Sequence, residues 1–298
     1  MAVTDVGVAQ GALGKTVAAS ILQFNKASVM APIVNMVACA KGTNVAQVPV
    51  YSKHALSEVT TSASGAEETT GSASSITSTA TSLEVFRNNV YAQVTDLAAY
   101  GNSDALLVNA GSILGNTVAA HFDEEGCALL DTFSTNTVGG AAVHMNMSLL
   151  FDAVAALEAN DAPRGYSGVF HPTQMWGNWG LTAELGNVQL GNAYGLLNSA
   201  GATGEALRSA GFAATIGGVD IYTSPQVVAT SDQHKGGIFS KDAISCGYID
   251  QGGGSFIQIE MDRNAPAAST EVVANGYFNL AVTVETHGVE VHTETSTA

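Results

Sequence analysis

Strand-like alternation of apolar and polar residues occurs on both sides of a long tract that holds almost no large apolar residue. The tract, residues 57–82, is mostly Ser, Thr, Ala and Gly, and it is flanked by residues 46–53 and 83–97. Because period-two alternation is typical of β-strands, the pattern predicts a β-hairpin with a long polar tip over residues 43–97. Such a projection has no obvious use inside one globule and favours contact with another molecule. An ordinary hairpin with a disordered loop is the alternative interpretation.

Helical periodicity follows directly after this segment. In residues 102–125 the apolar side chains recur three and four positions apart, which predicts a long amphipathic helix. Ser103 is placed to cap its N-terminus. The acidic residues 123–125 would oppose the helix dipole at the other end, so we expect that end to be frayed or solvated. A second helix is predicted over residues 147–159.

Short strands and turns alternate in the second half of the chain. Residues 166–170 have the pattern of a strand, and residues 171–180 begin a short helix with a proline near its start. Gly217 and Gly218 separate two alternating segments of residues 212–223, which predicts a hairpin. The remaining strand-like segments are residues 238–249, 255–261 and 277–286.

Charge is scarce in this chain and is mostly negative. Charged residues make up 12% of the sequence, about half of the usual ~25%. A surface poor in charge fits burial against neighbouring molecules, whose interface cores are depleted in charge, or a compositional bias of the source organism. The net charge is −16, and the ten basic residues are scattered. This distribution argues against a groove that binds nucleic acid by neutralising phosphates.

Neither a disulfide framework nor a targeting segment is predicted. Cys39, Cys127 and Cys246 are three isolated cysteines without CxxC spacing, so we expect reduced, mostly buried thiols rather than disulfides or a zinc site. The first residues lack the basic and apolar regions of a signal peptide. No window reaches the roughly 18 apolar residues of a membrane span.

Motifs for catalysis or ligand binding are absent or incomplete. Residues 11–16, GALGKT, resemble a phosphate-binding loop, but Ala9 stands where that motif requires glycine. The GxSxG and HExxH motifs do not occur. Residues 67–68 are both Glu, but they lie in the predicted polar tip, where a catalytic pair would not be held in place.

Two further residue pairs have structural interpretations. His287 and His292 would point to opposite faces of a strand, which excludes joint chelation and leaves surface histidines. Trp176 and Trp179 are expected in the core rather than in a ligand platform. We therefore predict no catalytic, cofactor-binding or metal-binding residue, and no enzyme.

The order of these elements resembles the major capsid proteins of tailed bacteriophages. The likeness extends over nearly the whole chain and includes the segments GFAATIGGVDIYTSPQV and HKGGIFSKDAI. It implies an α+β fold with an N-terminal arm, an extended β-hairpin loop, a long spine helix, an axial domain and a peripheral β-sheet domain. The implied segments are the arm (1–42), the extended loop (43–97), the peripheral domain with the spine helix (98–140), the axial domain (141–234) and the peripheral return strands (235–298).

This resemblance implies a structural coat protein. Such a protein assembles with itself as pentamers and hexamers into an icosahedral shell around phage DNA, in the host cytoplasm, and resides in the virion capsid. Portal, scaffolding and decoration proteins are the further partners implied; DNA is enclosed without sequence-specific contacts, and no membrane is involved. The stretch before Gly42 has no room for a scaffolding region, so a separate scaffold or a processed chain is expected. Lys53 lies on the loop, but no crosslink is predicted.

Three alternatives stay open. The first is an encapsulin-like nanocompartment shell, which would enclose an enzyme instead of DNA. The second is an exported β-rich adhesin or fibre subunit, which the Ser and Thr content favours and the missing export signal opposes. The third is an enzyme with an unrecognised site.

Overall fold

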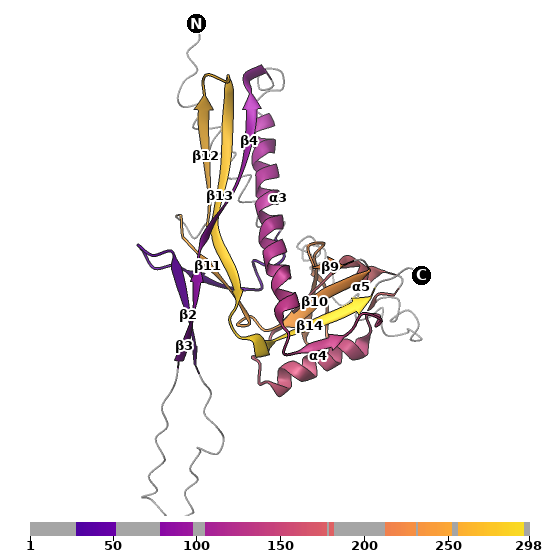
Figure 1. Cartoon of the computed structure of the whole chain (residues 1–298). Coiled ribbons are helices and arrows are strands. Elements are labelled where there is room, and N and C mark those ends of the chain that lie inside the picture. Colours follow the sequence, from indigo (N-terminus) through magenta and orange to yellow (C-terminus); the bar gives the residue numbers. More distant parts are fainter. Residues whose placement is uncertain are drawn as a thin grey trace, which may run out of the picture.

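The described chain forms two β-sheets, a long helix that joins them and a short two-stranded arm. Figure 1 shows helix α3 lying along β4, β13 and β12 and ending at a second body that holds β10, β14, α4 and α5. The arm of β2 and β3 projects from the first sheet, away from the tip of β12 and β13. The computed structural model describes residues 28–51, 78–97, 105–177, 179–181, 212–230, 232–251 and 256–294.

The first sheet combines strands from both ends of the chain. Its order is β1-β11-β13-β12, and β4 also pairs with β13. β1 runs parallel to β11, and the other pairs are antiparallel. The long strand β13 therefore has β4 on one side and, on the other, β12 followed by β11. The strands are β1 (Asn35–Ala38), β4 (Phe86–Thr95), β11 (Ile244–Tyr248), β12 (Ile257–Asn264) and β13 (Ser269–Val282).

Helix α3 (Ala105–Ala128) covers one face of this sheet and continues into a 3-10 turn, η2 (Leu129–Thr132). Phe122 of the helix packs against Phe256 and Phe278, with ring centroids 5.8 and 5.1 Å away. These rings are the centre of the first hydrophobic core. The predicted helix at residues 102–125 is confirmed from Ala105 onward, but its C-terminal end is regular and buried rather than frayed.

The second sheet has the order β5-β14-β10-β6-β8-β7, with β9 paired to β10. Helix α4 (Met147–Ala159) packs on it, and α5 (Pro172–Trp176) follows β6. A 3-10 turn, η3 (Glu285–His287), leads into β14. The strands are β5 (Thr137–Gly139), β6 (Tyr166–Phe170), β7 (Phe212–Ile216), β8 (Val219–Thr223), β9 (Ala229–Thr230), β10 (Gln233–Phe239) and β14 (Gly288–Glu294).

The predicted hairpin is present but is paired differently from the expectation. β2 (Val45–Tyr51) pairs with β3 (Ser78–Glu84), and only Leu83 and Glu84 of β3 come from the predicted second strand. The rest of that strand is β4, which pairs with β13 in the first sheet. A break at Val85 separates the two strands. The Ser/Thr tract thus supplies part of the arm itself.

Most other local predictions are confirmed. Helix α4 and strand β6 have the predicted bounds, and β7 and β8 form the predicted hairpin. Its turn residues Gly217 and Gly218 have φ of 60° and 83°, a region that glycine adopts without strain. The strand expected at residues 238–249 is wrong, because a turn after Phe239 divides it into β10 and β11, which belong to different sheets.

Several sequence features lie outside the described residues. They are the segment GALGKT (11–16), Lys53, residues 67–68 and Ser103. Within the described ranges, no helix is both long enough and apolar enough to cross a membrane.

Candidate functional site

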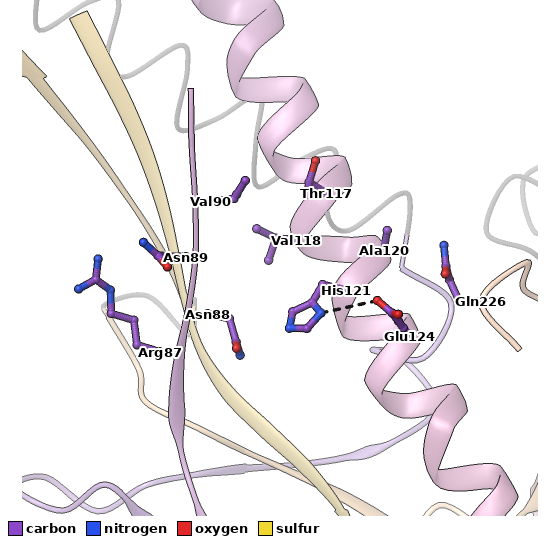
Figure 2. Close-up of a pocket in the computed structure, with 10 residues that line it drawn as sticks. All are labelled: Arg87, Asn88, Asn89, Val90, Thr117, Val118, Ala120, His121, Glu124 and Gln226. Atoms are coloured by element: carbon purple, nitrogen blue, oxygen red, sulfur yellow. Dashed lines mark ion pairs between the residues drawn. The ribbon is translucent and has the colours of Figure 1, made fainter. Parts of the chain in front are cut away.

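A groove of about 580 Å³ runs between strand β4 and helix α3 (Figure 2). It exists because the helix lies on the sheet through one apolar stripe, which includes Leu114, Val118 and Phe122, while its next stripe is polar. The groove is lined by Arg87, Asn88, Asn89 and Val90 from β4, by Thr117, Val118, Ala120, His121 and Glu124 from α3, and by Gln226.

The polar groups of the groove are held by their neighbours. His121 Nε2 lies 3.2 Å from Glu125 Oε1, and its Nδ1 lies 3.8 Å from Glu124 Oε2. Burial raises the pKa of Glu125. Figure 2 shows Arg87 pointing away from the helix, where its Nε donates to Asn275 Oδ1 at 2.9 Å. An apolar floor with polar walls of this kind fits contact with a polypeptide segment.

Large apolar side chains are exposed on several elements. Single exposed apolar residues are ordinary on a protein surface, but a gathering of them indicates a binding surface. Three lie on or just after β4, where Phe86 and Tyr91 point to opposite faces of the sheet. Those at least about half exposed in the described ranges are Tyr51, Phe86, Tyr91, Leu97, Ile113, Phe151, Trp176 and Trp179.

The predicted core location of the two tryptophans is wrong. Trp176 and Trp179 are 53% and 49% exposed. A side chain at Gly177 would place its Cβ 2.4 Å from Thr173 O, so only glycine allows the tight exit from α5 that leaves the rings outside. Trp179 stacks on His144, with centroids 4.7 Å apart and planes at 17°. The glycines around Trp179 in the sequence were the available signal for this turn.

Asp123 holds the segment before β1 onto α3. Its carboxylate accepts hydrogen bonds from Ser28 Oγ at 2.8 Å, from Val29 N at 2.9 Å and from Met30 N at 2.9 Å. Burial raises the pKa of Asp123, although these hydrogen bonds oppose that shift. Met30 packs against Gly126, where an added Cβ would lie 2.9 Å from Met30 Cε. We call this contact of residues 28–30 with α3 the arm anchor; it is separate from the two-stranded arm of β2 and β3. Sequence periodicity missed it because it joins residues far apart in the chain.

The histidines predicted at the surface have partners. His287 belongs to η3, and its Nδ1 lies 2.8 Å from Asp242 Oδ2. His292 lies on β14, with its Nε2 3.1 Å from Gln233 Oε1. Both rings are partly buried. They do not meet, as expected, but neither is a free surface histidine.

The cysteines are free thiols, as predicted. Cys127 and Cys246 are buried and Cys39 is half-buried. Burial raises the pKa of Cys127 and of Cys246 to about 12, so neither thiol is a nucleophile near neutral pH. In the described part of the chain, no group of three His, Cys, Asp or Glu residues is arranged to hold a metal ion.

Comparison with known proteins gives a match at the level of structure. The sequence matches no protein-family model and no curated protein. The capsid of Ralstonia phage GP4 superposes with a TM-score of 0.68 and 11% identity, over 88% of this chain and 87% of that chain. A chain of Mycobacterium phage Che8 covers 83% and 84%, with a TM-score of 0.54 and 18% identity. The chain has the phage capsid fold.

The phage capsid fold is not confined to phages. The SrpI encapsulin complex of Synechococcus elongatus matches with a TM-score of 0.60 and 11% identity, over 90% of this chain and 88% of that chain. The likeness predicted from the order of elements is thereby confirmed for the fold. At these identities the likeness concerns the fold alone.

Proposed function

We propose that this chain is a phage major capsid protein, which assembles with copies of itself as pentamers and hexamers into an icosahedral shell around DNA. The observation that carries the proposal is the match to the GP4 capsid, which takes in more than four fifths of both chains. A likeness of that extent takes in most of the chain rather than one common motif.

Surface chemistry supports assembly. Interfaces are enriched in aromatic residues and depleted in charge, and this chain combines 12% charged residues with half-exposed Tyr, Phe and Trp side chains. Each contact between subunits can be weak, because a closed shell multiplies it. The net charge of −16 suits a wall that encloses DNA without adsorbing it.

The division into five segments belongs to the same proposal. Residues 1–42 are the N-terminal arm, 43–97 the extended loop, 98–140 the peripheral domain with the spine helix, 141–234 the axial domain and 235–298 the return strands. The second sheet takes β6 and β8 from the axial segment and β14 from the return strands. The two segments therefore share one sheet.

The partners follow from this role. Further copies of the chain are the main partner, and portal, scaffolding and decoration proteins would join them in the virion, which is assembled in the host cytoplasm. The protein would be structural rather than enzymatic, with no cofactor and no membrane contact.

A cellular nanocompartment is the second candidate function. It is favoured by the encapsulin match and by a virus-like particle from Pyrococcus furiosus, which covers 93% of this chain and 98% of that chain with a TM-score of 0.56 and 9% identity. Particles purified from the native source distinguish the two functions. Nuclease-protected DNA inside them supports the phage shell, and an enclosed enzyme supports the nanocompartment.

Assembly itself is tested with the purified chain. Size-exclusion chromatography with light scattering gives its mass, and negative-stain microscopy gives its shape. We expect rings of five or six subunits, or closed shells. A monomer at every salt and protein concentration would contradict the proposal.

A further inference from the structure

The short helix α5 begins at a histidine whose ring acts as its N-cap. His171 has extended backbone dihedrals, and its Nδ1 accepts a hydrogen bond from Thr173 N at 3.3 Å. The same Nδ1 lies 2.7 Å from Thr173 Oγ1. N-caps are usually Ser, Thr, Asp or Asn, whose oxygen accepts at any ordinary pH. An imidazole nitrogen accepts only while it carries no proton.

The ring of His171 stacks on a second histidine. His234 of β10 lies parallel to it, with centroids 4.1 Å apart and planes at 6°. His234 is buried, and its Nδ1 has no hydrogen-bond partner among the described residues. Burial lowers the pKa of both rings, and His234 lowers that of His171 further. Both rings are therefore neutral at pH 7.

The charged groups around the pair do not offset the free-energy cost of protonating these rings. Asp232, which precedes β10, favours a proton on His234 but is itself exposed. Thr293 of β14 lies directly opposite His234 of β10. The next residues along the two strands, Lys235 and His292, are also opposite each other, and their side chains point to the other face of the sheet. On α5 the neighbours are Thr173 and Gln174, which carry no charge.

Gln174 connects the cap to the second sheet. Its Oε1 accepts from His171 N at 2.9 Å, which completes a capping box. Its Nε2 donates to Thr293 Oγ1 at 2.7 Å and to His234 O at 3.3 Å. Gln174 is fully buried. The attachment of α5 to β10 and β14 therefore depends on the geometry that His171 sets at the start of the helix.

We propose that the His171–His234 pair is an acid-sensitive latch, and that protonation of His171 releases α5 from the second sheet. A proton on Nδ1 replaces the acceptor of the cap with a donor, which opposes Thr173 N–H. It also places a positive charge at a helix N-terminus, where the dipole disfavours it. Trp176 ends α5 and Trp179 follows it, so release repositions two exposed apolar side chains that an assembly contact would use.

Tryptophan fluorescence reads this element alone, because Trp176 and Trp179 are the two tryptophans of the chain. We expect the emission maximum of the full-length protein to move to longer wavelength between pH 7.5 and pH 5, below the ordinary histidine pKa of about 6.5. His171→Asn keeps a cap that does not titrate, and it should remove the shift. Far-UV circular dichroism at pH 7.5 verifies folding, and His171→Ser is the second variant if Asn disturbs it.

The matched control is His144→Gln. His144 stacks on Trp179, so this variant separates a change local to Trp179 from a change that begins at the cap. A shift that persists in His144→Gln and disappears in His171→Asn supports the latch. A shift that disappears in His144→Gln, one that persists in both cap variants, or an unchanged spectrum in the parent protein would overturn it. The test uses the unassembled chain, so its outcome is independent of whether shells form.

Discussion

The second sheet and the β4 region of the first sheet differ in how many of their faces are buried within one subunit. In the second sheet, neighbouring residues of one strand point into different cores: Val169 and Phe239 belong to the core around Phe122, and Phe170 and Ile238 to the core under α4. In the first sheet, residues of β4 point alternately toward α3 and toward the opposite face, where they are exposed. A sheet buried on both faces holds a subunit together, whereas a sheet buried on one face leaves a surface for partners.

The largest effect on the free energy of unfolding is expected where α3 covers the first sheet. Phe86 and Phe278 are directly paired across β4 and β13, yet Phe86 is 55% exposed and Phe278 is fully buried. Phe278→Ala should lower the free energy of unfolding by about 3–5 kcal/mol, because it opens a cavity beside Phe122 and Phe256. Urea unfolding of the unassembled subunit measures this. Phe86→Ala is the control, and a loss as large as that of Phe278→Ala would show that the two positions are equally packed.

A second expected loss concerns the arm anchor. Asp123→Asn should cost about 1–3 kcal/mol, because an amide group would face backbone N–H donors that now meet a carboxylate. Glu124→Gln changes the same charge on the exposed side of the same helix turn, and should change stability by less than ~0.5 kcal/mol. Thermal unfolding of both variants compares them. Equal stabilities of the two variants would mean that the hydrogen bonds of the arm anchor add nothing to the free energy of unfolding.

Elements with local signals were predictable from sequence, and contacts between distant segments were not. Helix α4 and the Gly217–Gly218 hairpin follow from periodicity and turn chemistry within a few residues. The partner of β4 is β13, some 180 positions later in the sequence, and nothing in residues 83–97 specifies it. The same reason explains Asp123, whose charge appears unfavourable at a helix C-terminus until donors from residues 28–30 reach it.

The candidate surface was predictable only in its general character. Low charge and the Ser/Thr-rich projection indicated contact with other molecules, but the groove and the exposed edge of β4 require α3 and β13 to be placed in space. The tryptophans show the limit of composition alone, since aromatic residues are expected in a core unless a turn such as that at Gly177 directs them outward.

A smaller effect on stability is expected where η2 meets the second sheet. Lys235 Nζ pairs with Asp131 Oδ1 and lies 3.6 Å from Glu290 Oε1. The hydrogen bond to Asp131, followed in effect by the Glu290 charge, raises the pKa of Lys235. The folded state therefore binds this proton more tightly, so its contribution is complete below the unfolded pKa of about 10.4 and is lost as pH rises above it.

The comparison for this prediction is Lys235→Met. Unfolding measured at pH 8 and pH 11 should show a smaller decline with pH in Lys235→Met than in the parent protein. At pH 8 the variant should be less stable by about 1–2 kcal/mol, because Asp131 and Glu290 would lose their shared cation. Parallel pH profiles for the two proteins would rule out a role for Lys235 in this dependence.

The smallest effect on folding should accompany a large effect on assembly, at the uncovered face of the first sheet. Tyr91 is 64% exposed and pairs with Val273, in the middle of β4. Thr, like Tyr, is favoured in strands, so Tyr91→Thr should change the free energy of unfolding by less than ~0.5 kcal/mol. An exposed tyrosine of this kind is a typical interface anchor, worth about 2 kcal/mol or more when truncated.

Sedimentation should then show fewer assembled particles for Tyr91→Thr. Thr95→Ala, exposed on the same face, should assemble like the parent protein. Normal assembly of Tyr91→Thr would mean that this face of the sheet stays open in the shell, and that β4 is exposed for a reason other than contact between subunits.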